Sequence, residues 1–230
     1  DDIKNLIDIA RKFYCTNGFL NVLSGAQAAI NLLPYLFPSG DVSIIEPTYN
    51  EYKQTFLNTN WKVNIVHNLK KMEGSTIAII CNPNNPDGKI FYQDDLIKLS
   101  KKVDLLVIDE SFMDLYPSLS MSNIINKNTK NIIILKSFGK FFGLAGVRLG
   151  FIISGQDISE KIENLIGPWQ VSNPAIIAGI QALKDDVWIK NNIQKLKKYA
   201  YKLDILANQL NWRLVAVSYT HLTLPTKLAV

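Results

Sequence analysis

Residues Asn131–Ser154 read NIIILKSFGKFFGLAGVRLGFIIS. The apolar runs NIIILKS and VRLGFIIS each predict a buried strand, and the Gly-rich aromatic segment between them predicts a loop. Similar short apolar runs occur earlier, at residues 42–46, 75–81 and 103–109, with helical patterns between them. Continuous apolar strands that alternate with helices predict an α/β fold, in which helices cover both faces of a mostly parallel central sheet.

The rest of the chain fits the same alternation. NPNNPDG, at Asn82–Gly88, is dense in Pro, Asn and Gly, so it predicts a loop. The residues from Asp157 to about Leu210 are helical in pattern, and Gly167-Pro168 interrupts them. Further helices are expected at residues 1–14, 24–36 and 93–102, and further strands at 19–23 and 61–66.

Composition excludes several functional classes. The net charge is +5, but the positive residues are scattered, and the densest run, KLKK at Lys195–Lys198, is typical of a solvated helix face. We therefore expect no nucleic-acid partner. No run of 18 apolar residues occurs and the first residues are charged, so we expect a cytoplasmic protein without a membrane span. The chain has two cysteines without paired spacing, so we expect reduced thiols. It has two histidines, which argues against a His-rich metal site or a Ser-His-Asp triad.

Several polar or aromatic residues directly follow predicted strands, where ligands of parallel sheets bind. Ser24-Gly25-Ala26-Gln27 joins a strand to a helix, and free backbone N–H groups make such a turn an anion site or simply a tight turn. Tyr49 is able to stack on an aromatic ring or to serve only in packing. Asp109 ends an apolar strand, where its carboxylate needs a hydrogen-bonding partner or acts as a helix cap.

Lys140 is the most informative of these residues. It follows a buried strand inside SFGKFFGLAG, and desolvation in such a setting lowers the pKa of a lysine and frees its amine for Schiff-base formation. The alternative is a lysine that extends from a loop into solvent. Arg148, eight residues further on, adds a second positive charge next to the following strand.

SGAQ, PTY, NPNNPDG, DESF and SFGKFFGLAGVRLG occur in this order along the chain. The ordered set resembles the class I/II aminotransferase superfamily of pyridoxal-phosphate (PLP) enzymes, over about Asn21 to Gly179. The resemblance implies the large domain of PLP fold type I and pyridoxal 5'-phosphate as cofactor. It also implies that the phosphate is held by Gly25, Ala26, Gln27, Ser137 and Arg148.

The same resemblance implies roles around the cofactor ring. Tyr49 stacks on the ring, and Asn85 hydrogen-bonds its phenolic oxygen. Asp109 pairs with the ring nitrogen, and Lys140 carries the cofactor as a Schiff base. Phe112 stands where many aminotransferases have a tyrosine that donates a second hydrogen bond to the phenolic oxygen. Phenylalanine has no hydroxyl and cannot donate this bond.

Within the superfamily, the sequence is most similar to the threonine-phosphate decarboxylases of cobalamin biosynthesis. The similarity lies in Phe112, in CNPNNPDGKI, in LKSFGKFFGLAGVRLGF and in GPWQVSNPAI at Gly167–Ile176. It implies a lyase that decarboxylates L-threonine O-3-phosphate, and a homodimer. Histidinol-phosphate aminotransferases are the alternative. A PLP-binding regulatory domain, as fused to some DNA-binding regulators, and an inactive fragment are alternatives of another class.

The resemblance also suggests a domain division. Residues 1–185 are expected to form the PLP-binding large domain, and residues 186–217 an interdomain helix and the start of a truncated small domain. By comparison with the family, we expect that an N-terminal arm and the arginine-bearing small domain lie outside this sequence. Residues 218–230, SYTHLTLPTKLAV, resemble a translated sequencing adapter, so we expect a non-native tail.

Overall fold

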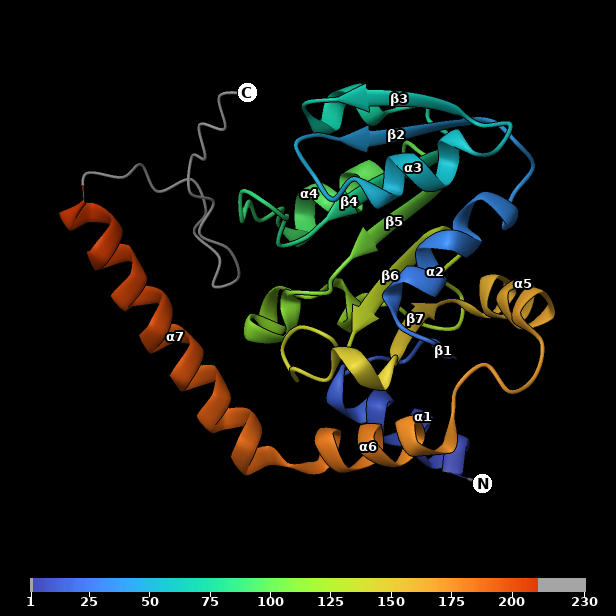
Figure 1. The fold of residues 1–230 in the computed structure, drawn as a ribbon. Coiled ribbons are helices and arrows are strands. Elements are labelled where there is room, and N and C mark those ends of the chain that lie inside the picture. The colour runs from blue at the N-terminus through green and yellow to red at the C-terminus, as the bar shows by residue number, and fades with distance from the viewer. Residues whose placement is uncertain (1, 211–230) are drawn as a thin grey trace.

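The computed structural model describes residues 2–210 and is built on a seven-stranded sheet (Figure 1). The strand order is β1-β7-β6-β5-β4-β2-β3. Only β7 runs against the other strands of the sheet, because it pairs antiparallel with both β1 and β6. The mostly parallel α/β sheet expected from the sequence is therefore confirmed. The strands are β1 (Phe19–Leu23), β2 (Asp41–Ile45), β3 (Lys62–Val66), β4 (Ile77–Cys81), β5 (Leu105–Asp109), β6 (Ile132–Ser137) and β7 (Gly150–Ser154).

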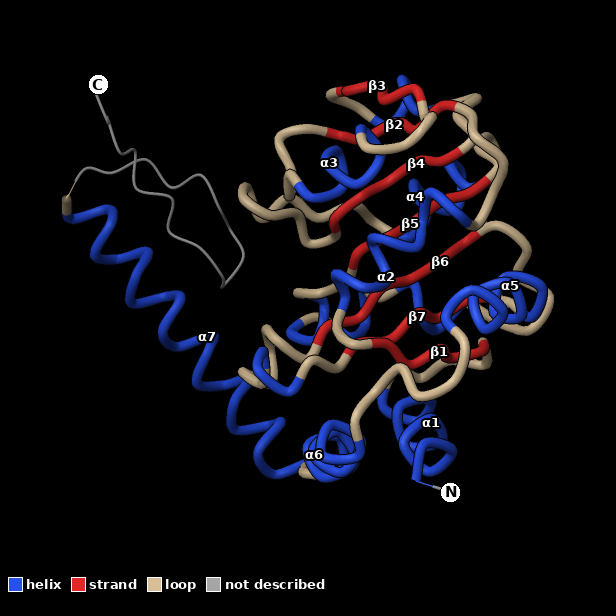
Figure 2. The backbone as a smooth tube through the Cα atoms, turned by 45° about the vertical axis from the view of Figure 1, so that its right-hand side comes forward, coloured by secondary structure: helices blue, strands red, loops and turns tan. Residues whose placement is uncertain are grey.

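Helices cover both faces of the sheet (Figure 2). One apolar core lies between the sheet and α1, α4 and α6, and a second core lies between the sheet and α2, α3 and α5. Because both faces are covered, the central strands are buried along their whole length, which explains their continuous apolar sequences. The helices are α1 (Asp2–Phe13), α2 (Ala26–Leu32), α3 (Glu51–Leu57), α4 (Gln93–Ser100), α5 (Gln156–Ile166), α6 (Asn173–Lys184) and α7 (Asp186–Gln209).

Several element boundaries differ by a residue or two from the sequence-based expectation, and two differ by more. The strand expected from Val147 starts only at Gly150, because Ala145–Val147 forms a 3-10 turn and Arg148 is left-handed, with φ of 56°. The helix expected to reach Leu36 ends as an α-helix at Leu32 and continues as a 3-10 turn. Pro34 has no backbone N–H, so it cannot continue the α-helical hydrogen-bond ladder.

Helix α7 leads away from the body of the molecule (Figure 1). Its first turn is held by Trp188, whose ring stacks on Phe142 at a centroid distance of 5.9 Å. Further along, the helix exposes large apolar side chains, namely Tyr201, Leu203, Ile205 and Leu206. The domain boundary placed at residue 186 stays a prediction, and the expected tail at 218–230 lies outside the described residues.

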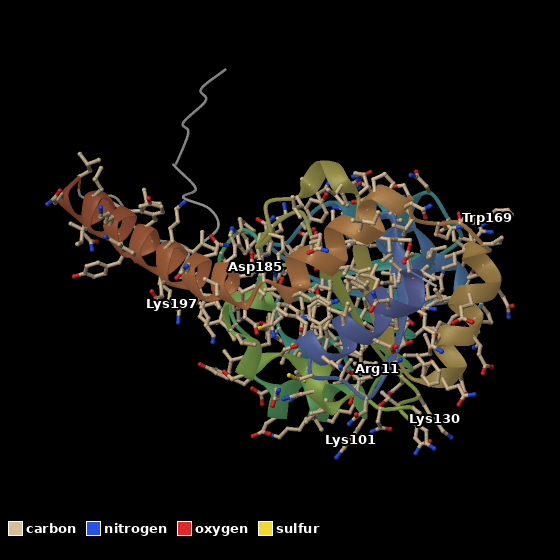
Figure 3. The ribbon with its side chains drawn as sticks, turned by 90° about the horizontal axis from the view of Figure 1, so that it is seen from below. Arg11, Lys101, Lys130, Trp169, Asp185 and Lys197 are labelled. Carbon is tan, nitrogen blue, oxygen red and sulfur yellow. The ribbon has the colours of Figure 1, made fainter. Side chains whose placement is uncertain are left out.

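The surface charges are dispersed. Lys101 and Lys130 are exposed on one side of the molecule, and the exposed Lys197 lies away from them on α7 (Figure 3). Over residues 2–210, no helix combines the length and the hydropathy that a membrane span requires.

The ends of β5 and β6 carry charged residues on both faces of the sheet. Side chains alternate along a strand, so Asp109 and Ser137 face one side while the neighbouring Glu110 and Lys136 face the other. Lys136 and Glu110 form an ion pair, with 2.7 Å between Nζ and Oε2, and both side chains are almost completely buried. Ser120 donates a second hydrogen bond to Glu110 Oε2, and the backbone N–H of Met121 donates to its Oε1 at 2.7 Å.

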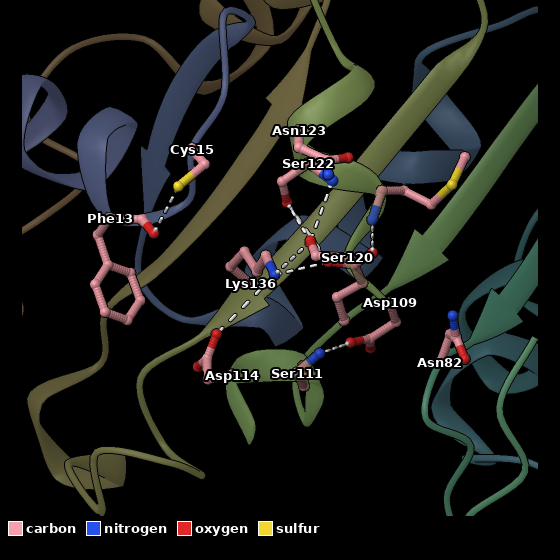
Figure 4. A network of polar contacts seen from close by, with 12 residues as sticks. Phe13, Cys15, Asn82, Asp109, Ser111, Asp114, Ser120, Ser122, Asn123 and Lys136 are labelled. Carbon is pink, nitrogen blue, oxygen red and sulfur yellow. Dashed lines mark hydrogen bonds and ion pairs between the residues drawn. The ribbon is translucent and has the colours of Figure 1, made fainter. Parts of the chain in front are cut away.

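Asp114 is a second buried carboxylate beside this pair (Figure 4). Its Oδ1 lies 4.0 Å from Lys136 Nζ, and its Oδ2 has no hydrogen-bond partner among the described residues. Burial raises the pKa of Asp114 from 3.8 to about 6, with Lys136 opposing the shift and Glu110 adding to it. The ionised form of Asp114 therefore destabilises the folded state at neutral pH.

Asp114→Asn should change how stability depends on pH. Because the folded-state pKa of Asp114 is raised, its stabilising contribution is complete below pH 3.8 and is lost as pH rises through about 6. Between about pH 7.5 and about pH 5, the free energy of unfolding of the wild type should rise relative to the variant by about 1 kcal/mol. Urea unfolding at both pH values measures this, with the exposed Asp104→Asn as control. Parallel pH profiles for wild type and Asp114→Asn would contradict the assignment.

Candidate active site

A pocket of about 350 Å³ opens at the carboxyl ends of β4, β5 and β6, beside the start of α2. A volume of this size is within the range of small-molecule sites. The structure brings every residue predicted from the sequence to this one pocket, although those residues come from segments far apart in the chain. They are Gly25, Ala26, Gln27, Tyr49, Asn85, Asp109, Phe112, Ser137, Lys140 and Arg148.

One end of the pocket is suited to an anion. The β-sheet register places Gly150 between Leu23 and Ser137, which brings the β1–α2 turn next to the end of β6. The first N–H groups of a helix have no partner within it, so the start of α2 offers donors. A β-carbon on Gly25, which has φ of 87°, would lie 2.9 Å from Arg148 Nη2. Glycine thus lets the turn and the guanidinium approach each other closely.

The other end of the pocket carries a buried carboxylate. Asp109 is only 4% exposed, and both of its oxygens accept hydrogen bonds. The Tyr52 hydroxyl donates to Oδ2 at 2.6 Å. The Ser111 backbone N–H donates to Oδ1 at 2.9 Å (Figure 4). These donors supply the partners that a carboxylate at the end of an apolar strand requires.

The side chain of Asn84 joins the loop that carries Asn85 to the loop that carries Tyr49. The Asn84 side chain donates to the Pro47 carbonyl at 2.8 Å and accepts from the Thr48 hydroxyl at 2.8 Å. Tyr49 and Asn85 are therefore fixed relative to each other at the pocket wall. The Tyr49 hydroxyl reaches Gln27 Oε1 at 3.4 Å, which connects this wall to α2.

Lys140 lies at the pocket with its side chain exposed. Its Nζ lies 5.3 Å from the centroid of the Phe112 ring. The expectation that Lys140 is desolvated in an aromatic stretch is wrong for the described structure. The neighbouring Phe141 and Phe142 turn into the apolar core, while Lys140 turns to the open side of the pocket.

GPWQ lies beside the anion end of the pocket. The Ser24 hydroxyl, in the β1–α2 turn, donates to the backbone carbonyl of Gln170. Trp169 is 95% exposed and points outward at the edge of the molecule (Figure 3). The segment is thus attached to the pocket by its backbone.

Sequence reasoning missed several pocket residues. Tyr52 follows Tyr49 by three positions across the start of α3, and the two rings lie edge to face at a centroid distance of 5.6 Å. That spacing within PTYNEY was the available signal. Burial and the charge of Asp109 raise the pKa of the Cys81 thiol to about 12, so this cysteine stays protonated. The other pocket residues that were missed are Ile30, Ser111, Gly139, Ala145 and Leu149.

The arrangement fits a phosphorylated heteroaromatic group. Arg148, Ser137 and the start of α2 suit a phosphate, and Asp109 at the far end suits a protonated ring nitrogen. Lys140 places a primary amine at the opening. Among residues 2–210, no group of three or more His, Cys, Asp or Glu side chains is placed to hold a metal ion.

Comparisons with known proteins agree with this fit. Residues 8–224 match the family model for aminotransferase class I and II. A threonine-phosphate decarboxylase from a Sinorhizobium species is 35% identical over 77% of this chain and 55% of its own length. A histidinol-phosphate aminotransferase from Baumannia cicadellinicola is 31% identical over 88% of this chain and 59% of its own length. The chain thus spans between half and two thirds of these relatives.

Solved structures support the fold. The crystal structure of L-threonine-O-3-phosphate decarboxylase from Porphyromonas gingivalis superposes with a TM-score of 0.75, over 91% of this chain and 70% of that one, at 22% identity. At this identity the likeness concerns the fold, which is that of PLP fold type I. The chain therefore belongs to the aminotransferase class I and II family, and its cofactor is pyridoxal 5'-phosphate.

Proposed function

We propose that this chain carries pyridoxal 5'-phosphate on Lys140 and decarboxylates L-threonine O-3-phosphate to (R)-1-aminopropan-2-ol O-phosphate. The observation that carries the substrate assignment is the 35% identity to a threonine-phosphate decarboxylase. Phe112 at the pocket wall supports it, because it resembles the decarboxylases at a position where many aminotransferases have a tyrosine.

Each pocket residue then has a distinct task. Arg148, Ser137 and the first N–H groups of α2 would bind the cofactor phosphate, while Asp109 would hold a proton on the ring nitrogen. Tyr49 would stack on the ring. When bound, the cofactor draws electrons from the substrate Cα, which weakens whichever bond stands perpendicular to the ring.

Lys140 has two tasks in this proposal. Its Nζ would hold the cofactor covalently before the substrate is bound. In its protonated form, the same amine would be able to give a proton to the substrate Cα after loss of carbon dioxide. Its exposed position at the pocket opening leaves it room for both.

Histidinol-phosphate aminotransferase activity is the second candidate. The Baumannia cicadellinicola enzyme, 31% identical over most of the chain, favours it. The same residues would serve this reaction, with Lys140 moving the proton from Cα to the cofactor instead. Both candidates act on a phosphorylated amino compound, which suits the positive net charge of the chain.

Three properties accompany the decarboxylase proposal because the resemblance implies them. The protein forms a homodimer with an active site near each subunit contact, resides in the cytoplasm and serves cobalamin biosynthesis. The regulatory-domain alternative shares the cofactor pocket but has no catalytic turnover.

Lys140→Ala should abolish covalent cofactor binding. The purified wild type with pyridoxal 5'-phosphate should absorb visible light and yield a borohydride-stable adduct, which peptide mapping locates. The variant should lose both signals, because among residues 2–210 Lys140 is the only lysine that lines the pocket. Lys89→Ala, at an exposed lysine in the loop after β4, is the control and should keep both. An adduct mapped to a different lysine would contradict the assignment of Lys140.

Asp109→Asn should slow turnover by about 100-fold or more, because it removes a preorganised charge that stabilises the protonated ring nitrogen. Steady-state kinetics with saturating cofactor measures the effect, and the exposed Asp104→Asn serves as control. A variant with a near-normal turnover rate would show that Asp109 has another role.

The substrate assignment is tested with the protein from the complete reading frame. One reaction contains L-threonine O-3-phosphate, and a second contains histidinol phosphate with 2-oxoglutarate. We expect carbon dioxide from the first and no glutamate from the second. Glutamate without carbon dioxide would instead identify an aminotransferase.

A further inference from the structure

Tyr52 is almost fully buried, at 1% exposure, and lies at the start of α3, against the end of β5. Its hydroxyl is 2.6 Å from Asp109 Oδ2, a separation typical of a hydrogen bond from a hydroxyl to an ionised acceptor. Asp109 is itself 4% exposed, so water contributes little to stabilising its charge. The two protein donors, Tyr52 and the Ser111 N–H, therefore carry most of that stabilisation.

The direction of donation is fixed. Burial, the charge of Asp109 and the nearby Cys81 all raise the pKa of Tyr52 well above 10. Tyr52 stays protonated over the physiological pH range, so it donates and Asp109 accepts. A hydrogen bond donated to a carboxylate favours its ionised form and makes it a weaker base.

The basicity of Asp109 decides where a shared proton lies. A proton between a carboxylate and a ring nitrogen stays on nitrogen only if the carboxylate is the weaker base. Without the Tyr52 donor, the buried carboxylate of Asp109 would keep one protein hydrogen bond fewer, in a place where water cannot replace it.

We propose that Tyr52 is a positioning residue that acts through Asp109, holding its Oδ2 and keeping the proton shared with the cofactor on the ring nitrogen. The proposal rests on the proposed function, in which Asp109 faces that nitrogen. Tyr52 itself does not touch the reacting atoms. Tyr52 also contacts Tyr49 edge to face, and so helps to position the ring that is proposed to stack on the cofactor.

The first test uses the protein without cofactor. In Tyr52→Phe, which keeps the ring and removes the hydroxyl, the carbon-13 chemical shift of the Asp109 carboxyl should differ clearly from that of the wild type, because one of its two hydrogen bonds is lost. Carbon-13 NMR of the labelled aspartate carboxyl measures it, with Asp109→Asn identifying the signal. Tyr14→Phe is a matched control, because Tyr14 is a buried tyrosine whose hydroxyl has no hydrogen-bond partner among the described residues. An unchanged chemical shift of the Asp109 carboxyl in Tyr52→Phe would overturn the proposal.

The second test uses cofactor labelled with nitrogen-15 in the ring. In wild type and Tyr14→Phe the chemical shift should be that of a protonated nitrogen at neutral pH. In Tyr52→Phe it should move toward the neutral value, and in Asp109→Asn it should move further. If Asp109→Asn leaves the shift unchanged, the proposed role of Asp109 fails and the Tyr52 proposal falls with it. If only Tyr52→Phe leaves it unchanged, the Tyr52 proposal alone is overturned.

Turnover separates this role from a purely structural one. If Tyr52 acts through Asp109, the double variant Tyr52→Phe/Asp109→Asn should be no slower than Asp109→Asn alone, because the two changes remove one shared effect. Rate losses that multiply in the double variant would mean that Tyr52 acts independently of Asp109, against the proposal.

Discussion

The ion pair between Lys136 and Glu110 is the interaction on which the pocket depends. It joins the end of β6 to the residue after β5, and both side chains are almost completely buried. Removing one partner of a buried pair leaves an uncompensated charge and costs about 3–5 kcal/mol. The pair therefore holds the two strand ends side by side, and the hydrogen bonds from Ser120 and Met121 fix the orientation of Glu110.

The position of this pair also fixes which residues face the cofactor pocket. Asp109 precedes Glu110 and Ser137 follows Lys136, so each pocket residue is one position from a member of the pair. A slip of one residue in either strand would exchange the faces. Lys136 or Glu110 would then face the pocket, and Ser137 or Asp109 would face the apolar core. The ion pair on one face thus enforces the register of the site on the other.

Much of the site was predictable because its residues follow strands. The carboxyl ends of parallel strands meet at one edge, so motifs such as DESF and SFGK come together whatever the details of packing. The contact between Tyr52 and Asp109 was not predictable in this way, because it depends on how α3 packs on β5, 57 residues away in sequence. The same is true of Asn84, which joins two loops. The sequence left open whether Lys140 is desolvated or exposed, because hydrophobic neighbours in sequence do not say which side chain turns outward.

The reversed strand β7 explains why two positive residues meet at this edge. Because β7 runs against β6, the loop that joins them lies at the carboxyl edge of the sheet, where the parallel strands end. Lys140 and Arg148 both lie on this connection. The pairing of Gly150 with both Leu23 and Ser137 brings the β1–α2 turn to the same place. A parallel strand in this position would have required a crossover, and its first residues would have lain at the opposite edge. One antiparallel strand in a parallel sheet therefore places the lysine, the arginine and the anion-binding turn around a single pocket.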